Sequence, residues 1–308
     1  MNTFDAQAAT AFVVSQTTHV ETAVNATVYP DIQYPALIPV DTSANPFTQT
    51  VTYYSSDMFG KADWINGNSD DIPIAGSERS KFQTSVYTAG IGYGYGWEEV
   101  NVAMMSGVNL QSDDAAAARR AYEEMVDRVM LRGDATKGFS GIMNYPGVAA
   151  AAAPTGDWSD PATTTNQILD DLNALLMITP AGTLFTTYAD TLLLPPGVIL
   201  ALGARRLNDL AEKTILEYFT ANNVYTLATG QRLTIRAVRG LETAGAGNTR
   251  RAVAYRRSPD VLKAHIPMPH RFFPVFQDGP LHWVVPGVFR LGGLDIRRKK
   301  EVNYMDGI

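Results

Sequence analysis

The alternation of apolar and polar residues in the first third of the chain predicts two β-strands joined by a long turn-rich segment. Residues 47–57 (FTQTVTYYSSD) and 81–91 (KFQTSVYTAGI) are rich in Thr, Val, Tyr and Phe, which favour strands with one face in water. The residues between them are rich in Asn, Asp, Gly and Pro, which favour turns. We therefore expect a long β-hairpin with a complex tip. Because two strands alone are marginally stable in water, we expect another surface to cover it.

A period of three to four residues predicts two amphipathic helices further along the chain. The first runs from Asp113 to Leu131, with Ser112 as its cap and Gly133 as its stop signal. Its apolar side chains fall on one face, and i,i+4 pairs of arginine and glutamate fall on the others. The second helix is predicted from Pro161 to Ile178, with Asp160 as its cap.

Helices and strands alternate over residues 155–260, which indicates an α/β domain. The elements expected there are a strand over Thr191–Leu194, a helical stretch over Pro196–Ala221 with a break near Asn208, and strands over Arg232–Val238 and Arg251–Arg256. At the other end of the chain, residues 1–45 are rich in Thr, Ala and Pro, and Pro30, Pro35 and Pro39 would interrupt any helix. This segment is predicted to be an extended arm.

Charge is distributed unevenly along the 308 residues, although the net charge is only −6. Residues 1–118 contain 3 Lys or Arg and 13 Asp or Glu, whereas residues 232–308 contain 14 and 6. The two ends of the chain can therefore attract each other, within one copy or between copies. The absence of cysteine excludes disulfides and thiolate metal ligands. No apolar run approaches the ~20 residues of a membrane helix, and the N-terminus has no pattern of a secretory signal.

Candidate chemistry is scarce, and we predict no catalytic, cofactor-binding or metal site. The glycines at positions 90, 92, 94 and 96 do not have the G-x-G-x-x-G spacing of a dinucleotide site, so a strand that bends or packs closely on another backbone explains them better. His265 and His270 with Asp278 are the candidate metal ligands, but no ordered element is predicted to hold them. The basic run Arg297–Lys300 favours a solvated or partner-facing surface, with contact to nucleic-acid phosphates as the alternative.

The order of these elements, together with several short motifs, resembles that of the phage major capsid proteins of the Hong Kong 97-like fold. The chain is similar to the branch of that family described in phage genomes as a domain of unknown function. The stretches that carry the resemblance run over residues 47–308: DIPIAG (71–76), YTAGIGYGYGWEEV (87–100), AAAARRAYEEMVDRVMLRGD (115–134), GFSGIMNYPGV (138–148), DTLLLPP (190–196) and FRLGGLDIRRKKEVNYMDGI (289–308).

This resemblance implies an α+β fold in four parts: an N-terminal arm (1–45), an extended β-hairpin loop (46–98), a peripheral domain with a long spine helix (99–154 and 266–308), and an α/β axial domain (155–265). It implies a structural subunit that self-assembles as hexamers and pentamers into the icosahedral shell around a double-stranded DNA genome. The subunit is then part of the virion, assembled in the host cytoplasm. The candidate interface residues are Lys61, Trp64, Asp70, Asp71, Lys81, Arg297, Arg298, Lys299 and Lys300.

The partners implied are other copies of the chain, together with scaffold, portal and decoration proteins, and DNA only through non-specific contact. Some relatives of this fold join a loop lysine to a neighbour's asparagine, and here Lys61 or Lys81 with Asn303 are the residues to consider. Two alternatives stay open. One is an encapsulin-type compartment with the same fold, and the other is a carbohydrate-active or carbohydrate-binding protein, suggested by the β segments rich in Tyr, Trp and Thr.

Overall fold

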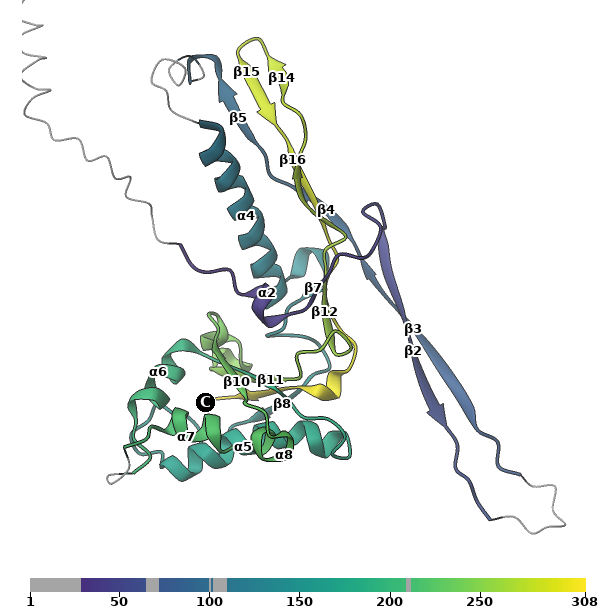
Figure 1. Ribbon diagram of the computed structural model, residues 1–308, viewed down its shortest axis with the longest axis vertical. Helices are drawn as coiled ribbons and strands as arrows, with labels where there is room; N and C mark the ends of the chain where they lie inside the picture. The colour runs from purple at the N-terminus through teal and green to yellow at the C-terminus, as the bar shows by residue number, and fades with distance from the viewer. Residues whose placement is uncertain (1–28, 65–71, 100, 102–109, 209–211) are drawn as a thin grey trace, which may run out of the picture. The chain divides into compact units, whose positions relative to one another are not determined.

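The computed structural model describes residues 29–64, 72–99, 101, 110–208 and 212–308. By its internal contacts the chain divides into residues 1–31 and residues 32–308. Every helix and strand described below belongs to the second unit, and Figure 1 labels most of them. The predicted N-terminal arm lies largely outside the described residues.

A five-stranded mixed sheet forms the centre of the second unit. Its order is β10 (Thr234–Ala237), β9 (Thr191–Leu194), β11 (Arg251–Tyr255), β18 (Val302–Asp306) and β8 (Ala149–Ala152). The outer pairs are parallel and the inner pairs antiparallel. Leu192 and Leu194 belong to one hydrophobic cluster and Leu193 to another. Because successive side chains of a strand point to opposite faces, both faces of this sheet are buried at its three inner strands, β9, β11 and β18.

One face of the sheet is covered by four helices: α5 (Thr165–Gly182), α6 (Pro196–Ala204), α7 (Ile215–Ala221) and α8 (Val224–Thr229). The predicted start of α5 is wrong. Asp160 caps a turn instead, where it accepts the N–H of Ala162 at 2.8 Å. The helix begins after Thr164, which exchanges hydrogen bonds with Gln167 in a capping box. The predicted strand Thr191–Leu194 and the predicted break between α6 and α7 are confirmed.

The other face packs against α4 (Leu110–Arg132), the short α2 (Tyr34–Leu37) and a sheet of β1 (Val40–Asp41), β12 (Leu262–His265) and β17 (Gly293–Ile296). The long helix predicted over Asp113–Leu131 is confirmed, and its N-terminal end lies three residues earlier. It buries Tyr122, Val126, Val129 and Met130. Gly133 ends it with φ of 82°, where a Cβ would lie 2.3 Å from the carbonyl oxygen of Phe139.

Three smaller sheets and a two-stranded hairpin, which is described below, complete the fold. The three sheets are β13 (Met268–Phe272) with β16 (Gly287–Leu291) and β4 (Tyr87–Gly90), β14 (Phe276–Gly279) with β15 (His282–Val285) and β5 (Tyr93–Gly96), and β6 (Gly133–Asp134) with β7 (Phe139–Ser140). The glycine-rich strand is thus divided between two sheets. A Cβ on Gly92 would lie 2.3 Å from the carbonyl oxygen of Val285, so the predicted close packing on another backbone is confirmed.

Candidate subunit interface

A long two-stranded hairpin exposes most of its side chains to water. β2 (Thr50–Phe59) and β3 (Gly76–Ser85) run side by side as an antiparallel ribbon (Figure 1), with ten paired positions from Thr50–Ser85 to Phe59–Gly76. The hairpin was predicted over 47–57 and 81–91, but residues 87–90 pair in another sheet. Large apolar side chains of the hairpin remain in water, including Tyr54, Met58 and Phe59, which are 62–84% exposed.

The two faces of the hairpin carry different charges. The pairing places Asp57 directly opposite Glu78, and both side chains are exposed. Tyr53 lies on the same face, four positions before Asp57. Its ring stacks on that of Phe82, with the ring centroids 5.1 Å apart. The opposite face carries the cations of β3, which are Arg79 and Lys81. We call the face with Asp57 and Glu78 the acidic face.

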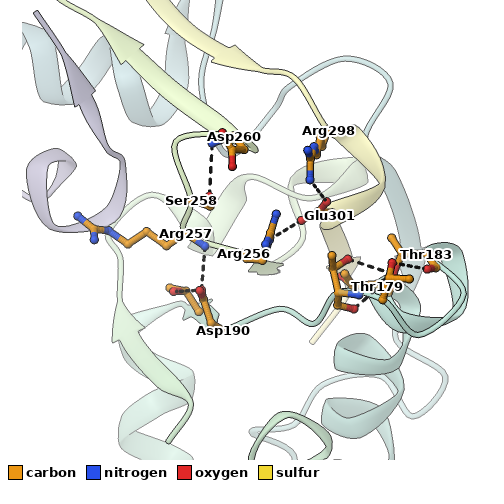
Figure 2. A network of polar contacts seen from close by, with 12 residues as sticks. Thr179, Thr183, Asp190, Arg256, Arg257, Ser258, Asp260, Arg298 and Glu301 are labelled. Atoms are coloured by element: carbon orange, nitrogen blue, oxygen red, sulfur yellow. Dashed lines mark hydrogen bonds and ion pairs between the residues drawn. The ribbon is translucent and has the colours of Figure 1, made fainter. Parts of the chain in front are cut away.

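The basic segment Arg297–Lys300 connects β17 to β18, and the buried carboxylate of Glu301 holds it in place. Glu301 is only 4% exposed and accepts from Arg256 at 2.6 Å and from Arg298 at 3.3 Å (Figure 2). A buried acid needs such partners because the cost of removing a charge from water is large. The 3₁₀ turn η4 (Lys299–Glu301) therefore has a fixed position at the start of β18.

The base of the hairpin contacts this basic segment. The guanidinium of Arg297 lies 4.8 Å from the ring centroid of Tyr53, and its Nε lies 3.3 Å from Asp295. Burial raises the pKa of Tyr53 to about 12, and the nearby Asp295 and Tyr145 act in the same direction. This cation–π contact thus joins the first third of the chain to its last twelve residues.

A pocket of about 510 Å³ lies where the hairpin base, the end of α5 and the basic segment meet. It is lined by Tyr53, Phe82, Tyr145, Thr183 and residues 297–301. The ammonium of Lys299 lies 5.7 Å from the ring of Tyr145. Neither Lys299 nor Lys300 forms an ion pair with any residue that the structure describes, and both are exposed. We call this the basic pocket. The ammonium groups of Lys299 and Lys300, which have no carboxylate partner among the described residues, suit an anionic partner.

Strand β18, which follows the pocket, is anchored on both sides. Nε and Nη2 of Arg251 donate to the two carboxylate oxygens of Asp306 at 2.6 and 2.8 Å. Although burial favours the neutral acid, the hydrogen bonds from Arg251 and from the N–H of Ala246 keep the pKa of Asp306 below its ordinary value. Asn303 is 1% exposed and donates to Thr179 at 2.8 Å. Asn303 is therefore not accessible to a neighbour's lysine.

The structure places the residues predicted for the interface in two regions. Lys61 and Trp64 are exposed near the tip of the hairpin, Lys81 lies on its basic face, and Asp70 and Asp71 lie outside the described residues. The four predicted basic residues line the pocket, together with side chains that sequence reasoning missed: Tyr53, Phe82, Tyr145 and Glu301. It also missed Asp57 and Glu78, which lie on the hairpin and do not line the pocket. The strand alternation predicts that Tyr53 and Asp57 share a face, but not what that face contacts.

The histidines considered as metal ligands have other surroundings. His265 is buried between Asp41 and Asp295, at 3.9 and 3.8 Å. His270 stacks on the ring of Tyr122, with centroids 5.3 Å apart. Over the described residues, no three His, Asp or Glu side chains gather in a way that would hold a metal ion. The same residues contain no helix with the length and apolar character needed to cross a membrane.

Comparison with known proteins places this arrangement in a known class. A family model described as "Major capsid protein" matches residues 60–308. The structure is similar to the capsid of Myoviridae phage XM1, with a TM-score of 0.80 and 18% identity over 96% of this chain and 98% of that one. It is also similar to a chain from Mycobacterium phage Bobi, with a TM-score of 0.63 and 12% identity over 96% and 97%.

The capsid of an empty GTA particle is a third similar structure, with a TM-score of 0.62 and 10% identity over 99% of both chains. No curated protein sequence matches significantly. At these identities the structural likeness establishes the fold. The phage capsid fold predicted from the sequence, with its mixture of helix and sheet, is thereby confirmed.

Proposed function

Because the chain belongs to the major capsid protein family, we propose that it is the shell subunit of a phage particle and assembles as hexamers and pentamers into an icosahedral shell around double-stranded DNA. The structural relatives are capsids of phages and of a gene transfer agent, which supports self-assembly of this chain. The proposal assigns the subunit a structural role without catalysis. It places the protein in the virion, after assembly in the host cytoplasm.

The observation that carries the proposal is the exposed hairpin. Ten paired positions are maintained although most side chains of both strands are in water. Apolar side chains such as Trp64 and Ile74, 99% and 89% exposed, flank the tip. Since two strands are marginal without a covering surface and exposed apolar groups favour contact, the hairpin suits a position across a neighbouring subunit.

The division of the subunit into arm (1–45), extended loop (46–98), peripheral domain (99–154 and 266–308) and axial domain (155–265) is part of this proposal. One hydrophobic cluster gathers around α4 and the other around α5, and the strands of the central sheet contribute side chains to both. Scaffold, portal and decoration proteins are proposed as partners because the chain belongs to the major capsid protein family. We expect contact with the packaged DNA to be non-specific.

Deletion of residues 61–71 tests the role of the hairpin. Lys61–Trp64, at the start of the deleted segment, are exposed, and so are Ile72–Ala75, which follow it, so the subunit should fold without residues 61–71. We expect an unchanged circular dichroism spectrum and no closed shells by electron microscopy. A matched variant replaces the same eleven positions by Gly and Ser, which separates the contribution of the side chains from that of the length.

Two results would contradict this reasoning. Closed shells formed by the deletion variant would show that the tip has no role in assembly. A lost helical signal would show that the segment belongs to the core of the subunit. The contents of particles formed by the unmodified chain distinguish the two kinds of shell. Nucleic acid inside them indicates a genome shell and not an encapsulin-type compartment.

A further inference from the structure

The acidic face of the hairpin contains an unfavourable pair of charges. Asp57 and Glu78 are directly opposite each other in the ladder, and both are exposed. Side chains at such positions lie about 4.5–5.5 Å apart at Cβ, and like charges there destabilise the pairing. Among the described residues, neither carboxylate forms an ion pair. The face therefore gains stability when a cation from outside the copy approaches it.

The basic pocket has the opposite imbalance. The two arginines of the basic segment are matched by Asp295 and Glu301, but Lys299 and Lys300 have no carboxylate partner in the described chain. An ion pair between Asp41 and Lys263, at 3.4 Å, joins the acidic residues 1–118 to the basic residues 232–308. Asp57, Glu78, Lys299 and Lys300 form no ion pair among the described residues, so their charges are available for contacts between copies.

We propose that Asp57 and Glu78 of one copy dock in the basic pocket of a second copy, against Lys299 and Lys300. This inference rests on the proposed function, and it specifies which face of the hairpin meets which surface of the neighbour. The aromatic walls, Tyr53 and Phe82, come from the receiving copy's own hairpin base. Each hairpin therefore lies with its acidic pair against the base of the next hairpin.

The geometry of one copy explains why the partner is a second one. Asp57 lies four positions beyond Tyr53 on the same strand, about 13 Å away at the rise of an extended chain. Tyr53 is already fixed against Arg297 of its own copy. A contact that uses two different surfaces of the same chain is heterologous, and it closes into a ring when the rotation between copies permits. Such a contact fits ring-shaped capsomers.

Reciprocal charge reversal tests the docking. One variant is Asp57→Lys with Glu78→Lys, the second is Lys299→Glu with Lys300→Glu, and the third combines all four changes in one chain. All four positions are exposed, so the variants should fold like the parent, as circular dichroism and urea denaturation will show. At about 0.1 M salt, we expect each reversal alone to raise the protein concentration required for assembly at least about tenfold. The combined chain should regain most of the loss.

A control variant reverses Asp170 and Glu212, two exposed carboxylates without an ion pair in the described chain, and changes the net charge by the same amount as the first variant. It should assemble like the parent. Light scattering and microscopy measure assembly for all variants across a salt series. High salt should reduce the difference between the single reversals and the parent, because exposed charges are screened.

Specific results would overturn the docking. Normal assembly of either reversal, or no recovery in the combined chain, contradicts it while the unmodified chain still forms shells. If Lys299→Glu with Lys300→Glu forms shells normally but the shells retain less DNA, the pocket binds nucleic acid instead. If the unmodified chain forms no shells or capsomers, the proposed function itself fails, and this outcome is distinct from the others.

Discussion

The ion pair between Arg251 and Asp306 fixes the strand that leads away from the basic pocket, and its removal has a predictable cost. Both side chains are 11% exposed, and two hydrogen bonds of 2.6 and 2.8 Å join them. Arg251→Met leaves Asp306 with the N–H of Ala246, at 3.1 Å, as its remaining donor. An uncompensated charge at a largely buried site costs about 3–5 kcal/mol, so we expect the free energy of unfolding to fall by that amount.

Replacing both partners should cost less than replacing either one. In Arg251→Met with Asp306→Leu no unpaired charge is left, and a buried ion pair exchanged for apolar groups is often neutral. We expect the double variant to lie within about 2 kcal/mol of the parent, with a coupling energy of about 2 kcal/mol or more. Urea denaturation of unassembled subunits at pH 7 measures all four corners of the cycle. Additive losses, or a single loss below about 1 kcal/mol, would refute the reasoning.

Two further predictions concern the folding of the body. Val126 is fully buried in the middle of α4, so Val126→Pro should prevent folding at a cost of ~3 kcal/mol or more. The control Arg120→Ala, on an outer face of the helix, should fold. Soluble, assembling Val126→Pro protein would show that the helix assignment is wrong. Burial raises the pKa of Tyr304 to about 12. The neutral Tyr304 side chain therefore contributes its full share of the free energy of unfolding below pH 10, and this share is lost as the pH rises toward 12. The urea midpoint of the parent should fall over that range, and the midpoint of Tyr304→Phe should fall less steeply.

The sequence predicts best the elements whose signals are local and repeated. The helix α4 has a long apolar period, strong helix formers and a glycine at its end, and its predicted bounds agree closely with the observed ones. The start of α5 was placed too early because Asp160 and Pro161 together form a common helix-start pattern. The competing capping box of Thr164 and Gln167 has the same local signal, and only the packed structure chooses between them.

The candidate interface was predictable only in part. The basic run Arg297–Lys300 is evident in the sequence, but the RRKKE pattern gives no sign that Glu301 is buried. That burial follows from Arg256, which lies 45 positions away in the sequence. Likewise, the contact between Tyr53 and Arg297 joins residues more than 240 positions apart. Contacts of this kind depend on the packing of the whole subunit, which no local pattern records.

Both surfaces of the proposed docking are anchored to the body of their own copy, and this affects how strongly a few charges can act. Lys299 and Lys300 lie in a turn held by the buried Glu301, and β18 begins directly after it. The acidic face is held through the stacked rings at the hairpin base and their contact with Arg297. Because association loses less conformational freedom when its surfaces are preorganised, a larger share of the electrostatic attraction remains as affinity. Loosening either anchor should therefore weaken assembly even when all four docking charges are retained.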